Sequence, residues 1–305
     1  MKKKILVVLG PTATGKSALA LHLAQKLGGE IISGDSMLVY KGFDIGTAKP
    51  SGDELKLVNH HLIDILDANE KYSAAAFQKA ASDIIEKLSD ENILPIIAGG
   101  TGLYIKALLE GYKFPDTFEQ PDIRRELEER YDRDGSEALY SILVQKAPDI
   151  AKDIHPNNKK RLVRALELLQ SGDMVSRQKQ TELIYDAKVI GLMAERPVLY
   201  DRINQRVDMM FEKGLVTEVE KLLAEDVNAM SPPMQAIGYK EVVNYLNGEY
   251  GLEECKRLVK QNTRHFAKRQ ITWYKKMSYI DWYDVSGESG MKKIYHDLPM
   301  QLVNR

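Results

Sequence analysis

The sequence predicts an α/β fold in which helices flank a parallel sheet and a helical insertion domain interrupts the chain. Apolar segments typical of buried strands alternate with helical segments through the first third of the chain. A glycine-rich phosphate loop directly follows the first of these strands. A charged stretch with helix-period apolar positions then precedes a later strand. Together these observations indicate a P-loop NTPase-like sheet, with its ligand site at the carboxyl ends of the strands.

The composition is that of a globular protein with a balanced charge. The chain has 305 residues, 44% of them apolar, and a formal net charge of -1. Affinity for an anionic polymer must therefore come from local clusters of Lys and Arg. The single cysteine, Cys255, excludes an intramolecular disulfide and a Cys-based zinc site. With no signal-peptide core and no membrane-spanning apolar run, we expect a cytoplasmic monomer with no membrane partner.

The first part of the core is expected to contain four strands, at 4–9, 30–33, 61–66 and 93–98. Helices are expected between them at 17–27, 73–88 and 103–109. Ser73 is a favourable N-cap, which supports the start of the second helix.

The insertion domain is expected at 115–186, where the charged sequence has a helical period and no clear strand. This assigns 1–114 and 187–305 to the core. Its second part is expected to hold a strand at 189–193, helices over about 198–277, a last strand in YIDWYDVSG and a short tail.

The phosphate loop reads GPTATGKS and comprises Gly10, Pro11, Thr12, Ala13, Thr14, Gly15, Lys16 and Ser17. Its position between a buried strand and a helix is the context in which this motif binds phosphates. We expect backbone amides from Thr12 to Gly15 to surround the phosphates, Lys16 to neutralise them and Ser17 to hold Mg²⁺. A glycine-rich turn without a ligand is the alternative.

Two absences narrow the class of P-loop protein. The strand at 93–98 has no terminal Asp of the kind that hydrolytic P-loop enzymes use near Mg²⁺, and the sequence has no N-K-x-D tetrad for guanine. A motor or switch protein is therefore disfavoured. A small-molecule kinase or a related transferase is favoured instead.

Two further polar residues are expected at the same edge of the sheet. Asp35 follows the second strand, where a carboxylate suits a general base or a Mg²⁺ contact. Thr101 lies in GGTGLY, after the fourth strand. Turn-forming roles are the alternatives for both segments, since Asp after Gly caps loops and glycine pairs occur in strand-to-helix turns.

Six motifs in order carry a resemblance to a known family. They are GPTATGKS, DSMLVYKGFDIGTAKP, GGTGLYIKALLEG, HPNNKKRLVRALEL, QAIGYKE and KRQITWYKK. The sequence resembles the bacterial tRNA dimethylallyltransferases, also called tRNA isopentenyltransferases, from the first strand to about Trp282. The long DSMLVYKGFDIGTAKP block is far more specific than the phosphate loop.

The resemblance implies transfer of a dimethylallyl group from dimethylallyl diphosphate to N6 of adenosine 37 in tRNA, with release of pyrophosphate. It implies Mg²⁺ as the cofactor and Asp35 as the base that takes the N6 proton. Thr101 matches the family residue that supports the adenine and the diphosphate, and Arg206 matches the arginine that contacts the diphosphate. Without the resemblance, Arg206 would read as an ordinary helix-surface arginine, four residues after Arg202.

The same resemblance implies contacts to the tRNA anticodon stem-loop from several segments. The matching residues are Asp35, Ser36, Met37, Leu38, Thr101, Arg124, Lys160, Arg161, Leu162, Val163, Arg164, Gly238 and Tyr239. From the residues alone, the basic cluster at 159–164 could equally be a solvated helix face, and Gly238 a helix-start glycine.

A cationic ridge is predicted on the helix that ends near residue 274. Lys256, Lys260, Arg264 and Lys268 recur every fourth residue, and no acidic residue occurs from Lys256 to Ile280. Such a ridge is expected to bind RNA phosphates. The nearby aromatic residues, among them Trp273 and Tyr274, are expected to pack in the core rather than stack on bases.

Two other functions remain open at this point. A small-molecule kinase would use ATP in the same loop, with Asp35 as base. An RNA-binding regulator would use the loop only to sense nucleotides. A kinase would transfer a γ-phosphate, and a regulator would catalyse no reaction, so an activity assay distinguishes both from a prenyltransferase.

Overall fold

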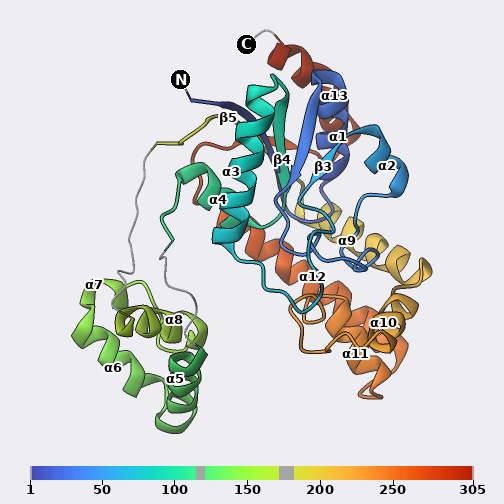
Figure 1. The fold of residues 1–305 in the computed structure, drawn as a ribbon. Helices are drawn as coiled ribbons and strands as arrows, with labels where there is room; N and C mark the ends of the chain where they lie inside the picture. Colours follow the sequence, from blue (N-terminus) through green and yellow to red (C-terminus); the bar gives the residue numbers. More distant parts are fainter. Residues whose placement is uncertain (1, 115–120, 172–181, 304–305) are drawn as a thin grey trace. The chain divides into compact units, whose positions relative to one another are not determined.

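The computed structural model describes residues 2–114, 121–171 and 182–303. The chain divides into two compact units, each described here by itself. Unit 1 contains Met1–Gly111 and Glu182–Arg305, and unit 2 contains Tyr112–Thr181. Figure 1 identifies the helices and strands of both units.

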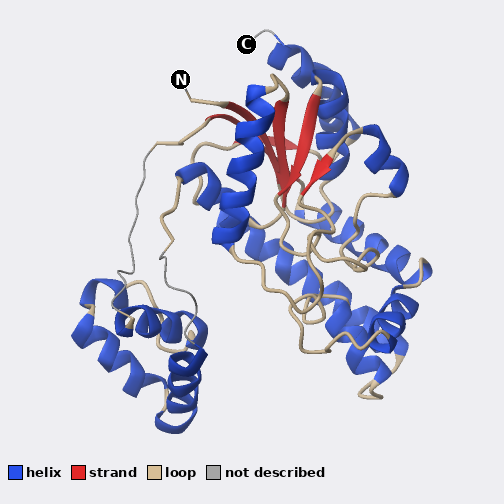
Figure 2. Cartoon of the chain, in the orientation of Figure 1, coloured by secondary structure: helices blue, strands red, loops and turns tan. Residues whose placement is uncertain are grey.

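Unit 1 is built on a parallel six-stranded sheet in the order β3-β2-β4-β1-β5-β6. The strands are β1 (Lys4–Leu9), β2 (Gly29–Ser33), β3 (His60–His61), β4 (Leu94–Gly99), β5 (Asp186–Met193) and β6 (Asp281–Asp284). Figure 2 shows them side by side, with helices around them. The predicted fold class is confirmed.

The central strand β1 is buried on both faces, as its continuous apolar sequence predicts. Val7 is opposite Ile97 of β4 and Val189 of β5. On one face, α1 (Lys16–Leu27) and α13 (Glu288–Val303) pack on Leu6 and Val8. The remaining helices of the first part are α2 (Gly52–Leu57), α3 (Ala74–Asp90) and α4 (Gly102–Glu110).

Sequence and structure differ at 62–66 and after β6. The predicted strand at 61–66 ends at His61, because Leu62 and Asp64 adopt positive φ values of 61° and 54°, which a strand does not accommodate. The predicted short tail is the helix α13, whose Ile294 and Leu298 are buried against the sheet. Ser73 is the N-cap of α3, as predicted, and accepts a hydrogen bond from the Ala76 amide at 3.1 Å.

The second part of unit 1 is helical and has its own apolar core. Its helices are α9 (Arg196–Glu212), α10 (Leu215–Ala224), α11 (Tyr239–Leu246) and α12 (Leu252–Tyr274). Val39, Phe43, Val219, Tyr239 and Cys255 are among the buried residues that form this core. The segment after β2 therefore packs against helices that are far away in the sequence.

Unit 2 contains α5 (Pro121–Asp134), α6 (Ser136–Lys146), α7 (Pro148–Ala151) and α8 (Lys159–Gln170). Leu127, Leu139, Leu143, Leu162 and Leu166 form its buried core. Asn158 caps α8 by accepting a hydrogen bond from the Arg161 amide at 3.3 Å. No helix within the described ranges is both long and apolar enough to cross a membrane.

Candidate active site

The phosphate loop connects β1 to α1 and is shaped as a nest for an anion. Ala13 and Gly15 have positive φ values of 64° and 84°, so the backbone reverses its direction within the loop. Consecutive amides in such a conformation point into one concavity. The Thr14 hydroxyl donates to the Pro11 carbonyl at 2.8 Å, and this hydrogen bond within the loop stabilises its conformation. A non-glycine residue such as Ala13 adopts this conformation at a cost of about 1 to 2 kcal/mol, a sign of a functional constraint.

Lys16 is the first residue of α1, and its ammonium has no hydrogen-bond or ion-pair partner among the described residues. Burial and the nearby positive charge of Arg206 lower the pKa of Lys16 to about 8, while the Asp35 carboxylate opposes the fall. A bound anion would supply the missing partner for this ammonium.

Asp35 lies beyond the carboxyl end of β2 and faces the phosphate loop. Its Oδ1 accepts a hydrogen bond from the Met37 amide at 2.9 Å. Lys16 and Asp35 both approach Gly100, because a Cβ on this glycine would lie 3.6 Å from Lys16 Cε and 3.7 Å from Asp35 Oδ2. The structure therefore brings the ends of β2 and β4 and the start of α1 together, as the sequence predicts.

Thr101 connects the end of β4 to the segment after Asp35. Its hydroxyl oxygen accepts from the Ser36 amide at 3.0 Å and donates to the Ser36 hydroxyl at 3.3 Å. The Thr101 amide donates to the Gly34 carbonyl at 3.2 Å. These bonds hold Asp35 between two fixed neighbours, which limits the positions that its carboxylate can take.

Arg206 reaches the same site from α9. Burial lowers the pKa of its guanidinium, whereas the Asp35 carboxylate raises it. The guanidinium makes no hydrogen bond or ion pair with the residues that the structure describes. Two cationic side chains, Lys16 and Arg206, thus face one site without anionic side chains to neutralise them fully.

These residues line a cavity of about 310 Å³ in unit 1. Its polar lining includes Thr12, Lys16, Asp35, Ser36, Thr101, Arg206 and Gln270, and its apolar lining includes Met37, Val207, Met210, Ile237, Val259 and Phe266. Leu38 is not among the lining residues. A cavity with convergent cations, a carboxylate and an apolar wall suits a small amphiphilic anion and its reaction partner.

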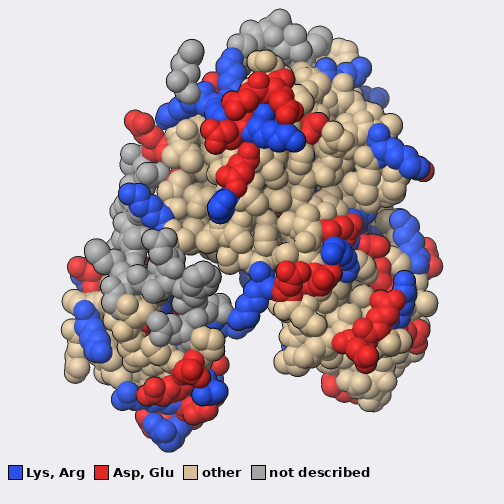
Figure 3. Space-filling view, in the orientation of Figure 1, with Lys and Arg blue, Asp and Glu red and all other residues tan. Residues whose placement is uncertain are grey.

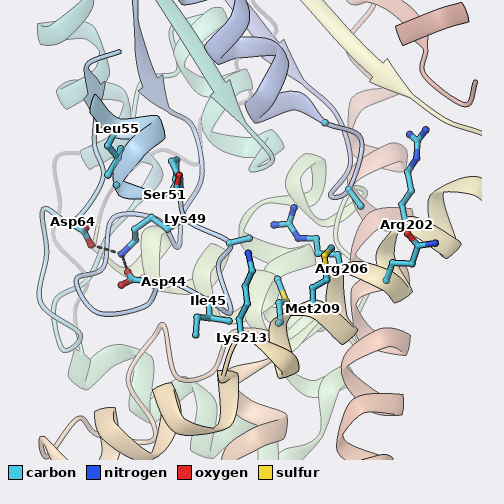
Figure 4. Close-up of a pocket in the computed structure, with 17 residues that line it drawn as sticks. Asp44, Ile45, Lys49, Ser51, Leu55, Asp64, Arg202, Arg206, Met209 and Lys213 are labelled. Atoms are coloured by element: carbon cyan, nitrogen blue, oxygen red, sulfur yellow. Dashed lines mark hydrogen bonds and ion pairs between the residues drawn. The ribbon is translucent and has the colours of Figure 1, made fainter. Parts of the chain in front are cut away.

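A second cavity, of about 750 Å³, has Ala13 and Gly15 of the phosphate loop in its wall. Figure 4 shows Arg206, Met209 and Lys213 side by side along it. Lys49, another lining residue, forms ion pairs with Asp44 and Asp64, which also line the cavity. Because Arg206 and Met210 line both cavities, the two are neighbours.

The loop at 44–47 lines both cavities and is held by one carboxylate. Glu218 accepts hydrogen bonds from the amides of Asp44, Ile45 and Gly46 at 3.2, 2.8 and 3.3 Å. It also accepts a hydrogen bond of 2.6 Å from the Tyr239 hydroxyl. Tyr239 packs so closely that a Cβ on Gly46 would lie 2.4 Å from its ring. The GFDIGT segment of the sequence is thus a rigid wall of the site.

The family model described as IPP transferase matches residues 38–277 of the chain. The chain belongs to the IPP transferase family. It is similar to the tRNA dimethylallyltransferase of Carboxydothermus hydrogenoformans, with 46% identity over 299 residues that cover 96% of each chain. The tRNA dimethylallyltransferase of Bacillus subtilis is 43% identical over 93% of this chain and 92% of its own.

Solved structures of the IPP transferase family agree with the fold. The full-length tRNA isopentenylpyrophosphate transferase of Bacillus halodurans has a TM-score of 0.75 and 41% identity, over 99% of this chain and 96% of its own. A eukaryotic dimethylallyltransferase, in a study of its action on tRNA, has a TM-score of 0.85 and 30% identity. That match covers 99% of this chain and 79% of the eukaryotic one. The family named from the sequence motifs is confirmed.

In this IPP transferase, the basic residues predicted to face RNA differ in their surroundings. Within unit 2, Arg124 and Arg164 both pair with Glu167, whose side chain is only 1% exposed. Lys160 and Arg161 lie on the first turn of α8, whereas Leu162 and Val163 are buried in the core of unit 2. Lys and Arg alternate with Asp and Glu on the face drawn in Figure 3.

The cationic ridge on α12 is only partly open. Lys260 pairs with Asp208 of α9 at 2.6 Å, and Arg264 donates to Asn204 at 2.7 Å. Lys256 pairs with Glu253 on its own helix. Lys268 is exposed and forms no ion pair within the described part of the chain. Of the other two predicted RNA contacts, Tyr239 is fully buried, and Gly238 is the N-cap of α11, with a positive φ of 99°.

Two site residues were missed by the sequence analysis. Gln270 lines the smaller cavity and contacts the phosphate loop, and Glu218 holds the loop at 44–47. Glu218 lies outside the quoted motifs, and Gln270 lies within KRQITWYKK, a motif that does not by itself assign a role to the glutamine. Their partners lie far away along the chain, so only the tertiary structure reveals them. Tyr274, predicted to be a core residue, is fully buried, but Trp273 is 36% exposed, so the same prediction is wrong for Trp273.

Proposed function

We propose that the protein transfers a dimethylallyl group from dimethylallyl diphosphate to N6 of adenosine 37 in tRNA and releases pyrophosphate. The observation that carries this is the convergence of Lys16, Arg206 and Asp35 on one cavity, in a chain of the IPP transferase family. Two cations suit a diphosphate, and a carboxylate suits a base. The apolar wall of the cavity suits a five-carbon chain.

In this reaction, the bond between C1 of the dimethylallyl group and the diphosphate oxygen breaks. The electron pair of that bond leaves with pyrophosphate, and negative charge therefore accumulates where the phosphate loop amides, Lys16 and Arg206 converge. Preorganised donors at such a position lower the barrier, because they stabilise the leaving group as it forms. Arg206 can donate two parallel hydrogen bonds to phosphate oxygens.

The new bond forms between C1 and N6 of the adenine. N6 is a weak nucleophile because its lone pair is delocalised into the ring, so a base has to remove a proton as the bond forms. Asp35 is our candidate for that base. Its Oδ1 is engaged by the Met37 amide, which leaves Oδ2 to accept the N6 proton.

Mg²⁺ would be held mainly by the diphosphate itself. Ser17 is exposed on the first turn of α1 and offers a hydroxyl next to the phosphate nest. Among the described residues, no group of three His, Cys, Asp or Glu side chains could hold a metal. This donor set fits Mg²⁺, which keeps several waters and binds proteins through few ligands plus substrate phosphates. When bound, the ion would neutralise charge on the departing pyrophosphate.

We propose that the acceptor adenine is turned out of the anticodon loop, because a stacked base cannot reach Asp35. Ser36, Met37 and Thr101 line the cavity and would contact the adenine. Leu38 would contact neighbouring nucleotides. Lys160, Arg161, Arg164, Arg124, Arg264 and Lys268 would bind phosphates, and Gly238 would bring backbone close to RNA. Leu162, Val163 and Tyr239 would act by supporting these elements, since their side chains are buried.

The decisive experiment is incubation of the protein with isotopically labelled dimethylallyl diphosphate, Mg²⁺ and unmodified tRNA that carries A36 and A37. We expect label on A37 and stoichiometric release of pyrophosphate. A parallel incubation with γ-labelled ATP tests the kinase alternative. Absence of label on tRNA, or movement of a γ-phosphate to a small acceptor, would overturn the proposal.

A further inference from the structure

Gln270 is a buried polar residue that joins the two loops of the active site. It lies on α12 and is 6% exposed. Its Oε1 accepts a hydrogen bond from the Thr12 amide at 3.0 Å, and its Nε2 donates to the Gly100 carbonyl at 2.9 Å. Thr12 belongs to the phosphate loop, and Gly100 directly precedes Thr101. One carboxamide thus bonds both to the phosphate loop and to the residue that precedes Thr101.

Tyr274 reinforces this connection one helical turn later. Its hydroxyl donates to the Gly100 carbonyl at 2.8 Å and lies 3.4 Å from the Gly10 carbonyl. The helix α12 crosses the edge of the sheet where the strands end (Figure 1), so Gln270 and Tyr274 meet both loops from the same side. Gly100 accepts both bonds through one carbonyl oxygen.

No other type of side chain of this size makes both bonds of Gln270. A carboxamide has one acceptor and one donor at its end, whereas a carboxylate only accepts and an apolar group does neither. The fit is tight, because a Cβ on Gly100 would lie 2.6 Å from Gln270 Nε2. The chain therefore combines a glycine at 100 with a glutamine at 270.

We propose that Gln270 is a positioning residue for prenyl transfer. It sets the separation between the phosphate loop, which holds the donor, and the Gly100–Thr101 segment, which fixes Ser36 and Asp35. This inference rests on the proposed function. Reaction between two bound substrates requires the reacting atoms at about 3 to 3.5 Å, and a displacement of about 1 Å can cost a factor of about 100 in rate.

The test is the steady-state kinetics of Gln270→Met, which keeps the length of the side chain and removes both hydrogen bonds. We expect kcat to fall by about 30- to 100-fold, while KM for each substrate changes by less than about threefold. Gln261→Met is the matched control. It makes the same change on the same helix, where the one side-chain hydrogen bond of Gln261 to a described residue comes from Arg257, and wild-type kinetics are expected.

Two further variants separate positioning from general stability. Gln270→Glu keeps the oxygen that accepts from the Thr12 amide, but it loses the N–H group that donates to Gly100 and adds a negative charge. We therefore expect kcat to fall and KM for dimethylallyl diphosphate to rise. If Gln270→Met does not fold, the kinetics of Gln270→Glu test the proposal instead. Tyr274→Phe should lower kcat less, and its effect should not add to that of Gln270→Met, because both act on the Gly100 carbonyl.

Wild-type kcat in Gln270→Met, or a loss confined to KM, would overturn this inference. So would strictly additive effects of Gln270→Met and Tyr274→Phe. The wild-type protein is measured in the same assay. Failure of the proposed function would therefore appear as an inactive wild type, whereas failure of this inference would appear as an active variant.

Discussion

The ammonium of Lys16 stands between a positive and a negative side chain, and this arrangement controls its protonation. Burial, and then the charge of Arg206, disfavour the charged form and Asp35 favours it, which gives a pKa of about 8. A diphosphate that binds here would shift the balance toward the charged form. Donor binding is therefore expected to depend on pH in a range where unperturbed lysines do not titrate.

We expect kcat/KM for dimethylallyl diphosphate to fall as pH rises above about 8, by about tenfold per unit, because free Lys16 then loses its proton. Below pH 8 the charged form predominates, and this contribution should be constant. The measurement is a pH profile at constant ionic strength. Lys16→Arg is the control, since its guanidinium stays charged, and a step at pH 8 in that variant would assign the titration to another group.

Asp35 should be separable from its neighbours by substitution with Asn. Asparagine keeps the oxygen that accepts from the Met37 amide, but it cannot take the proton from N6. We expect Asp35→Asn and Asp35→Ala both to lower kcat by more than about 100-fold, with tRNA affinity little changed. Single-turnover rates and tRNA binding measure the two effects. Equal losses of affinity and rate would assign Asp35 to RNA positioning instead.

At this scale, the sequence predicted residues whose chemistry is local. Lys16 follows from the phosphate motif, and Asp35 and Thr101 follow from their places after strands. Arg206 required a family resemblance, because a helix-surface arginine has no signature of its own. Gln270 and Thr12 are 258 positions apart, and no local pattern indicates that they meet.

At the scale of elements, the helix α10 holds the loop at 44–47 through the hydrogen bonds of a single side chain. Glu218 accepts four hydrogen bonds, three of them from consecutive amides of the loop at 44–47. A carboxylate satisfies such an array because both of its oxygens accept. The adjacent hydroxyl of Tyr239 is kept protonated, since burial and Glu218 raise the pKa of that phenol.

Glu218→Gln should destabilise the protein by about 1 to 3 kcal/mol, because its amide group would face donors that then lack acceptors. Urea unfolding measures the change. Glu220→Gln, on the exposed face of the same helix, is the control and should lie within about 0.5 kcal/mol of the wild type. Equal stabilities of the two variants would mean that the loop keeps its shape without Glu218.

The elements themselves were predicted well where the pattern is continuous. The strand at 4–9 has the predicted bounds, and the core strands around it differ by only a few residues. The segment 62–66 has the apolar residues of a strand but is not one, because Leu62 and Asp64 turn the backbone. The helix α13 was missed because its amphipathic pattern is weak and its apolar residues pack on α1.

At the scale of the whole molecule, tRNA binding should weaken as the salt concentration rises. Lys260 is engaged by Asp208, whereas Lys268 is exposed. We expect Lys268→Ala to weaken tRNA binding and to reduce the slope of log Kd against log salt by about one. Lys260→Ala should have a smaller effect, because its ion pair already neutralises that charge.

Filter binding across a range of salt concentrations measures this slope. Lys79→Ala is a suitable control, since Lys79 pairs with Asp83 on α3, where no RNA contact is proposed. An unchanged slope in Lys268→Ala would remove the ridge of α12 from the interface. A larger effect in Lys260→Ala would mean that its pair with Asp208 opens when RNA binds.

The single cysteine makes the chain well suited to fluorescence spectroscopy. Cys255 is buried, and burial raises the pKa of its thiol to about 11, so it reacts slowly with maleimides near neutral pH. Thiols introduced at exposed positions, such as Glu129 in unit 2 and Lys26 in unit 1, could therefore carry a dye pair without deletion of a native residue. Energy transfer between the dyes would measure the distance between the two labelled positions with and without tRNA.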